Sequence, residues 1–386
     1  MSNNIYCERG SDFSFEAIMQ LLNISFGFLT PETDLRGLLP KLYREELRPQ
    51  DANYVVVEDG EPVAAVGAYD HEIRVCGRTL PCRSVGNVAV HPNHRSKGYM
   101  KLAMNAALRD MIEDGIAISA LGGRRQRYLY YGYDKAATSY KYTITRENIH
   151  HVFGDFSAPF SIREVNDRND PVIEKIIALN DGLPFTPVRP REEYLYIANS
   201  WKAKLLVAED GDNFVGYFIL NGGRHATEVA TVQNESFIPF IRSIYAFFGE
   251  DFSLTLFPYQ MYYRMALTPF AEDMSVGFAM QFNILNYRSV AEAFLALKLT
   301  YTKLPDGEVK LLVHGYAGDE RICIAVKNGE QSVTVIDDSV PVDYELSHAE
   351  AIEFLFSPIS PRREAASELA RLYFPLPLCM RMADEV

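Results

Sequence analysis

The sequence predicts an α+β protein made of two tandem mixed-sheet domains, the second degenerate, followed by an α/β domain. Three observations predict it: the chain length, the alternation of strand and helix patterns, and the same order of strands and helices in the first and second regions. At about 150 residues per domain, 386 residues correspond to two or three domains. We expect these domains to span residues 1–150, 151–280 and 281–386.

The first domain shows clear local patterns. Apolar residues recur at helical spacing over residues 15–28, and the β-rich segment 54–57 precedes an Asp59-Gly60 hairpin signal. A second helix is predicted over residues 96–113, because its apolar residues recur at three- and four-residue steps. Further strands are expected over residues 63–69, 84–90 and 116–121.

The second domain repeats this order of elements. Helices are expected over residues 171–180 and 238–247, and strands over residues 204–208, 214–220, 228–232 and 252–257. No glycine-rich phosphate signature follows the strand at 228–232, so the second copy is predicted to be degenerate.

The third domain is predicted to begin with a helix and continue with a hairpin. Ser347 and Glu350 form a capping-box pattern before a further helix. The tail from Pro375 contains no Gly/Ser linker and is expected to pack back on the protein. Helices are expected over residues 290–299, 351–356 and 364–372, and strands over residues 309–314, 321–327 and 332–336.

Composition excludes several classes of protein. With 48% hydrophobic and 23% charged residues, the chain is neither disordered nor a small disulfide scaffold. Its 51 acidic and 38 basic residues give a charge of -13, which disfavours nucleic acid and anionic membranes as partners. The five cysteines are scattered without a Cys-x-x-Cys pair, which favours a reducing cytoplasm over a zinc site. Neither a signal peptide nor a membrane span is expected.

The most informative segment runs from Val88 to Met100, where a strand, a short turn and a long helix follow one another. Unpaired amides at a helix N-terminus bind phosphate groups, and the helix dipole adds partial positive charge. Gly98 would let the backbone approach such a ligand, and Arg95 or Lys97 would add charge. An ordinary connection with a solvated basic turn is the alternative.

The hexapeptide Arg95-Ser96-Lys97-Gly98-Tyr99-Met100 resembles the Arg/Gln-x-x-Gly-x-Gly/Ala coenzyme A signature of GCN5-related N-acetyltransferases (GNATs), departing from it at Met100. The closer resemblance is to the Eis (enhanced intracellular survival) type. It implies a catalytic GNAT domain, a degenerate GNAT-like domain and a C-terminal domain like sterol carrier protein. It also implies acetyl-CoA as co-substrate, no metal, and a homo-oligomer.

The resemblance assigns roles to the coenzyme-binding backbone. The pantetheine arm would pair like an added strand with Val88, Ala89 and Val90, and the pyrophosphate would lie on the amides of residues 95–100, namely Arg95, Ser96, Lys97, Gly98, Tyr99 and Met100.

A second motif, residues 125–133, contains the implied proton donor. In the Eis-like pattern, the tyrosine five positions before the aromatic residue of the Gly132-Tyr133 pair donates a proton, which points to Tyr128. A phenol holds a proton at neutral pH and can protonate the departing thiolate. The alternative is that Tyr128, one of 23 tyrosines, packs in an aromatic core.

The resemblance also implies that the terminal α-carboxylate, here on Val386, is the base. An α-carboxyl group is ionised at neutral pH, and Glu385 could share the role through water. The family often ends in an aromatic residue, from which this chain departs. The alternative is a frayed acidic tail.

Substrate contacts are expected in the loop after the first helix, where acidic residues would attract a cationic amine. The candidates are Phe26, Phe28, Glu32 and Asp34, although a solvated acidic loop explains the same pattern. The eight histidines show no metal-binding spacing.

Three functions fit these observations. The first is a cytoplasmic acetyl-CoA-dependent N-acetyltransferase that acts on the primary amine of a small molecule, lysine or peptide by direct attack in a ternary complex. The second is a lipid- or small-molecule-binding protein with a vestigial transferase domain. The third is an assembly element.

Overall fold

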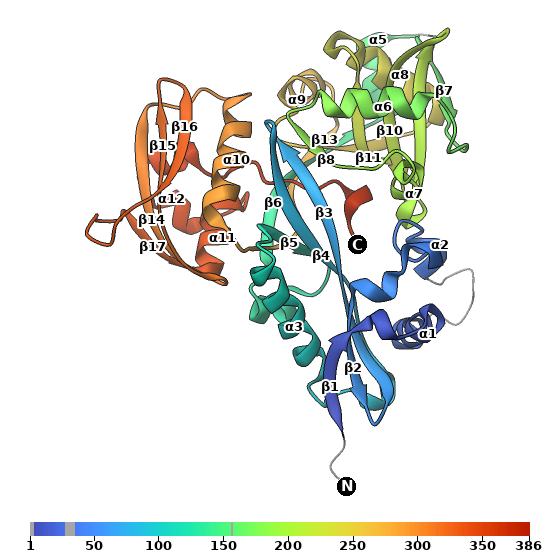
Figure 1. The fold of residues 1–386 in the computed structure, drawn as a ribbon. Coiled ribbons are helices and arrows are strands. Elements are labelled where there is room, and N and C mark those ends of the chain that lie inside the picture. The colour runs from blue at the N-terminus through green and yellow to red at the C-terminus, as the bar shows by residue number, and fades with distance from the viewer. Residues whose placement is uncertain (1–3, 28–34, 156) are drawn as a thin grey trace.

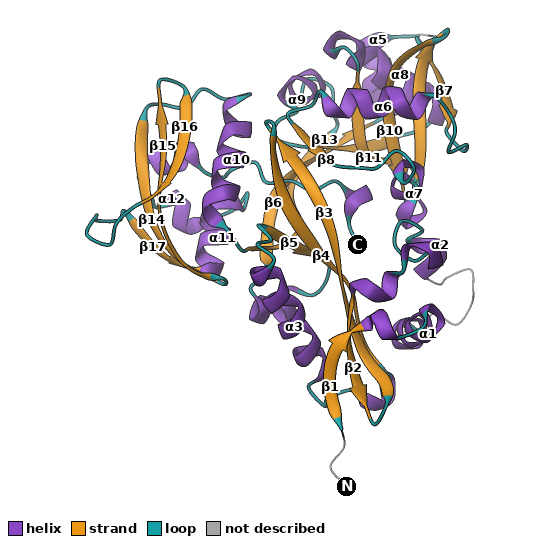
Figure 2. Ribbon diagram, viewed as in Figure 1, coloured by secondary structure: helices purple, strands orange, loops and turns teal. Residues whose placement is uncertain are grey.

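The computed structural model describes residues 4–27, 35–155 and 157–386. It contains helices and mixed sheets, and the coarse prediction of an α+β fold is confirmed (Figures 1 and 2). A thirteen-stranded sheet runs through the first two predicted domains, and a four-stranded sheet lies in the third.

The first part of the chain contains the expected helix–sheet alternation. Its helix α1 is capped by the Ser14 hydroxyl, which accepts from the Ala17 amide at 3.2 Å, and ends at Gly27 with a φ of 74°. The elements are β1 (Ile5–Arg9), α1 (Phe15–Phe26), α2 (Leu35–Leu38), β2 (Asn53–Glu58), β3 (Glu61–Val75), β4 (Arg78–Val90), α3 (Tyr99–Glu113), β5 (Ile118–Leu121), α4 (Arg125–Tyr128), β6 (Asp134–Ile144) and α5 (Arg146–Phe153).

Two helices cover opposite faces of the first strands. Side chains alternate across a strand, so Val56 of β2 packs in the cluster with α3, whereas Val55 and Val57 pack with α1. Figure 1 shows α3 and α1 on the two sides of β2, β3 and β4. Ligand-binding surfaces on this sheet therefore belong either to the α3 face or to the α1 face.

The second part follows the expected order with added short elements. The elements are β7 (Ser161–Glu164), α6 (Val172–Asp181), β8 (Phe185–Pro187), α7 (Tyr194–Ala198), β9 (Lys204–Asp210), β10 (Asn213–Asn221), β11 (His225–Thr231), α8 (Phe237–Phe248), β12 (Phe252–Leu256), α9 (Met261–Leu267) and β13 (Asp273–Ile284).

The two parts exchange strands. The sheet order is β1-β2-β3-β4-β5-β13-β6-β12-β11-β10-β9-β7, with β8 paired to β3. Strand β13 lies antiparallel between β5 and β6, and β6 in turn pairs with β12. The predicted boundary at 150 thus falls inside α5, between two strands of one continuous sheet, and the boundary at 280 falls inside β13 itself.

The third part folds around its own sheet, in the order β16-β15-β14-β17. The apolar side chains of Phe294, Leu297 and Phe354 are completely buried in the core. The predicted capping box is present, since the Glu350 carboxylate accepts from the Ser347 amide at 2.9 Å. The elements are α10 (Tyr287–Leu299), β14 (Gly307–Gly315), β15 (Gly318–Lys327), β16 (Glu330–Val335), β17 (Tyr344–Ser347), α11 (His348–Phe356), α12 (Pro361–Glu364) and α13 (Glu368–Tyr373).

His348, at the start of α11, joins the third part to the first. Its Nε2 lies 2.8 Å from the Gly132 carbonyl oxygen, and its Nδ1 accepts from the Tyr316 amide at 3.0 Å. This pairing requires a neutral imidazole with its proton on Nε2. Burial lowers the pKa of His348 from 6.5 to about 4.

We expect this histidine to make stability depend on pH. Between about pH 6.5 and 4 the unfolded chain binds the proton that native His348 excludes, so the unfolding free energy falls as pH drops through this window. Urea unfolding from pH 7 to 5 should show a steeper loss for the natural protein than for His348→Gln. Parallel pH profiles of the two proteins would contradict this assignment.

Candidate functional site

The site begins where β4 outlasts its neighbour β5. The two strands are parallel partners from Cys82 opposite Ile118 to Val85 opposite Leu121, where β5 ends. Strand β4 continues to Val90, held on its other edge by β3. Beyond Val85, β4 therefore has an edge with no strand partner in the described part of the chain, and an extended ligand can pair there.

A cavity of about 640 Å³ opens along this edge. It brings together the predicted backbone segment Val88–Val90 and most of the predicted turn. The lining residues are Ser25, Phe26, Val88, Ala89, Val90, His94, Arg95, Ser96, Gly98, Tyr99, Met100, Lys101, Arg127 and Tyr131.

The turn before α3 has the geometry of an anion site. Gly98 caps the helix with a φ of 83°, a conformation that favours glycine, and Ser96 has a φ of 66°. Within the helix, the Leu102 amide donates to the Gly98 carbonyl at 3.2 Å. The amides of the preceding turn lack intrahelical acceptors, as at any helix start, and lie at the cavity that Gly98, Tyr99 and Met100 line.

The charges at the turn differ in part from the expectation. Lys97 is not among the lining residues, and its ammonium group pairs with the Glu58 carboxylate at 2.9 Å. Buried Glu58 also pairs with His94 at 2.6 Å. Arg95 does line the cavity, and its Nη2 donates to the Ser25 carbonyl at 3.2 Å.

Sequence reasoning missed two further cations of this cavity, Lys101 and Arg127. Lys101 lies in the first turn of α3, so its proximity to the turn could have been deduced from helical spacing. Arg127 lies on α4, inside the motif that predicts Tyr128 as the proton donor. Together with Arg95, they give the cavity three cationic side chains.

Tyr128 ends α4 and is 6% exposed. Burial raises the pKa of its hydroxyl, while a hydrogen bond from Arg127 and that residue's charge lower it, so the phenol keeps its proton at neutral pH. Its ring packs at Gly123 and in the apolar cluster on the α3 face. The cavity lining includes its neighbours Arg127 and Tyr131 but not Tyr128, so its catalytic role stays a prediction.

A second cavity, of about 370 Å³, contains the chain terminus. Val386 packs against the cluster on the α1 face, and its Cβ lies 3.5 Å from the point where a Cβ on Gly86 would stand. Gly86 directly follows Val85, the last β4 residue paired to β5. The lining residues are Lys41, Leu42, Leu47, Tyr69, Asp70, His71, Glu72, Pro187, Val188, Pro190, Glu193, Ile197, Asp384 and Val386.

The last residues of the chain are held by the protein rather than frayed. The Lys41 ammonium donates to the carbonyls of Ala383 at 2.6 Å and Glu385 at 2.5 Å, and the Trp201 indole donates to the Glu385 carbonyl at 3.1 Å. Burial lowers the pKa of Lys41 to about 8 and raises that of Glu385 to about 7. The last residues thus have a fixed position, with the Val386 side chain beside β4.

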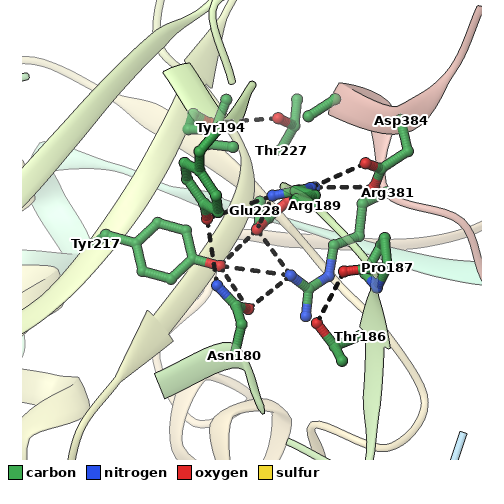
Figure 3. Close-up of polar contacts among 12 residues, drawn as sticks. Asn180, Thr186, Pro187, Arg189, Tyr194, Tyr217, Thr227, Glu228, Arg381 and Asp384 are labelled. Carbon is green, nitrogen blue, oxygen red and sulfur yellow. Dashed lines mark hydrogen bonds and ion pairs between the residues drawn. The ribbon is translucent and has the colours of Figure 1, made fainter. Parts of the chain in front are cut away.

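A buried cluster of ion pairs holds the tail at Arg381 and Asp384, a few residues before its end (Figure 3). Arg189 pairs with both Asp384 and Glu228 at 2.8 Å, and Arg381 pairs with Glu228 at 2.8 Å. Burial opposes ionisation of Glu228, but the two guanidinium groups prevail and lower its pKa to about 2. Sequence reasoning did not find this cluster, because its members lie far apart in the chain.

The predicted substrate residues are only partly placed. Phe26 lines the cavity at the β4 edge rather than the cavity with the chain terminus. Phe28, Glu32 and Asp34 lie outside the described residues. Glu385 does not line the second cavity, although its neighbours Asp384 and Val386 do. Lys41 and His71, which sequence reasoning missed, also line this cavity.

The described residues contain neither a cluster of metal-binding side chains nor a membrane-spanning helix. Within residues 4–27, 35–155 and 157–386, no three His, Cys, Asp or Glu side chains are grouped as a metal site would need. None of the helices in these ranges combines the length and apolar character needed to cross a bilayer.

Comparison with protein families decides the class of the first domain. Residues 8–136 match the family model described as an acetyltransferase (GNAT) domain. This GNAT domain contains the open β4 edge, the turn before α3 and Tyr128. Over residues 8–136, the resemblance is therefore confirmed at the level of the GNAT superfamily. The comparison with curated proteins found no match to this chain.

Several solved structures are similar in fold to most or nearly all of this chain. A GCN5-related N-acetyltransferase from Anabaena variabilis ATCC 29413 superposes with a TM-score of 0.68 at 17% identity, covering 98% of each chain. One from Kribbella flavida gives 0.64 at 18%, covering 91% of this chain and 89% of the other. Eis1 from Mycobacterium abscessus gives 0.62 at 13%, covering 98% of each chain. The Eis type and the sterol-carrier-like domain stay predictions.

We expect Asp384→Asn to loosen the tail. The change removes one carboxylate from the buried cluster and leaves Arg189 with a single ionic partner, which should lower the unfolding free energy on the order of 3 kcal/mol. It should also speed release of the last residues by carboxypeptidase. Asp212→Asn, at an exposed hairpin, is the matched control. Equal stability and equal cleavage of the two variants would refute a clamping role.

Proposed function

We propose that this protein is an acetyl-CoA-dependent N-acetyltransferase that transfers acetyl to a primary amine by direct attack in a ternary complex. One observation carries the proposal: the unpaired edge of β4 begins at Gly86, beside Val386, and continues along the cavity formed by the turn before α3. A thioester held along that edge would meet an amine held at the chain terminus.

The coenzyme would bind through groups that the cavity already presents. Its phosphates would be held by unpaired amides before α3, and Arg95, Lys101 and Arg127 would supply positive charge. Its pantetheine amides would pair with Val88–Val90 as an added strand does. The size of the cavity, about 640 Å³, lies within the range of cofactor sites.

The amine would enter the cavity that contains Val386. Val386 lines this cavity, and its carboxylate would attract the ammonium group of an amine. The apolar side chains of Leu42, Val188 and Ile197 also line it and would suit the carbon skeleton. Ternary-complex transfer also agrees with the absence of cysteine from both sets of lining residues, because a covalent acetyl-enzyme would need a nucleophile there.

The chemical step needs one base and one acid. The terminal carboxylate would take a proton from the ammonium group, with Glu385 assisting through water. The free amine would attack the acetyl carbonyl, the C–N bond would form, and the C–S bond would break. Tyr128 would give its proton to the departing thiolate.

The packed interior of the third domain favours an enzyme over a lipid-binding protein as the proposed function. Phe294, Leu297 and Phe354 fill the interior of the third domain, so its apolar residues are accounted for by packing. The acceptor's identity, a cytoplasmic location and homo-oligomer formation stay predictions, as does the lack of nucleic acid and membrane partners.

Tyr128→Phe should lower the rate of acetyl transfer while leaving acetyl-CoA binding nearly intact. Losing a general acid typically costs about 10²–10⁴-fold in rate, and the ring that packs at Gly123 is retained. Coenzyme A release would be measured with aminoglycosides, polyamines, lysine and peptide amines. Calorimetric titration with acetyl-CoA supplies the control. Undiminished turnover would remove Tyr128 from the donor role.

Removing the charge of the terminal carboxylate should lower kcat/KM for the amine by about 10²-fold or more, since the base would be lost. Deletion of Val386 moves the carboxylate by one residue, and a semisynthetic chain ending in Val386 carboxamide neutralises it in place. Both should bind acetyl-CoA like the natural protein. If either chain kept the full rate, the carboxylate would not be the base.

A further inference from the structure

The second cavity contains a histidine that the steps above leave unused. His71 lies on β3 and lines the cavity together with Val386. Its Nε2 is buried without a hydrogen-bond partner among the described residues. An orphaned buried nitrogen lowers stability, so one at a ligand cavity suggests a function.

The hydrogen bonding of the ring fixes which nitrogen can accept a proton. Nδ1 faces the Tyr69 carbonyl oxygen at 3.5 Å, and a carbonyl can only accept, so the proton belongs on Nδ1. Nε2 then carries the free lone pair. Burial lowers the pKa of His71, which keeps the imidazole neutral and able to accept a proton at pH 7.

The neighbouring charged groups are mostly engaged with other partners. Asp384 is paired to Arg189, Asp70 to Arg83, and Lys41 donates to the tail carbonyls. On the remaining sides of the cavity, Glu193 is paired to Arg44 and the Tyr69 hydroxyl donates to Asn87, which leaves Glu72 and the terminal residue Val386.

Proton counting shows why a second acceptor is needed. An alkylammonium group loses two protons on its way to an amide: one before the nitrogen attacks, and one as the amide forms. The proposed terminal carboxylate accounts for the first. Tyr128 delivers a proton to sulfur on the coenzyme side and accepts none from the amine.

We infer that Nε2 of His71 accepts the second proton of the substrate amine as the C–N bond forms and the C–S bond breaks. The imidazolium ion and the protonated terminal carboxyl group then each release a proton to water, and the Tyr128 phenolate regains one from solvent. The sum converts ammonium and acetyl thioester into amide, thiol and one released proton. This role rests on the proposed function and adds a catalytic residue to it.

The test combines His71→Ala with chemical rescue. We expect kcat/KM for the amine to fall about 100-fold or more, with acetyl-CoA affinity unchanged by calorimetry. Imidazole added to the buffer should restore part of the rate, which a purely structural loss would not allow. His71→Asn provides a second variant in case the alanine protein folds poorly.

His225→Ala is the matched control. His225 is also a partly buried histidine on a strand, but both of its ring nitrogens have partners, Ser253 and Thr255, and it lines neither cavity. We expect its variant to keep the natural rate and to ignore added imidazole.

The outcomes separate the two levels of the proposal. Full activity in a folded His71→Ala or His71→Asn protein would overturn the role of His71 alone, as would a loss of activity that imidazole does not relieve. No acetylation of any amine by the natural protein would overturn the proposed function and this role together.

Discussion

The candidate site depends on the point at which strand β5 stops pairing with strand β4. Once β5 stops at Leu121, the remainder of β4 is paired on one edge only. Backbone groups on the free edge need a partner, and the bulge at Gly67 and Gly86 shapes this segment. Because the free edge begins beside Val386, a thioester bound along it in the proposed reaction would be within reach of an amine in the second cavity.

The second constraint is the position of the C-terminal tail, which ion pairs and hydrogen bonds hold in place. A chain terminus normally moves freely, and a carboxylate that moves cannot act from a fixed position. Here Lys41 and Trp201 hold the tail backbone, and Arg189 holds Asp384. Buried ion pairs contribute little net stability but define one arrangement strongly, since each unpaired charge would be costly. The price is that residues from three distant segments must assemble before the site exists.

Local features of this fold could be predicted, and long-range ones could not. Helix α3, its Gly98 cap and the Ser347–Glu350 capping box follow from spacing and backbone preference. The exchange of β6 and β13 does not, because periodicity carries no information on which remote strand is the partner. Likewise, the sequence alone predicts that Lys97 can bind phosphate, but in the structure its ammonium group donates to Glu58, which lies 39 positions away in the chain. His71 gave no motif, since its importance lies in an unpaired nitrogen.

The central claim is that β4 beyond Val85 receives the coenzyme as an added strand. The most direct measurement is a crystal structure of the protein with acetyl-CoA. We expect the pantetheine arm to hydrogen-bond to the backbone of Val88–Val90, with the pyrophosphate on the amides before α3 and the acetyl group directed toward Val386. Coenzyme bound elsewhere, or none bound at saturating concentration, would contradict the account.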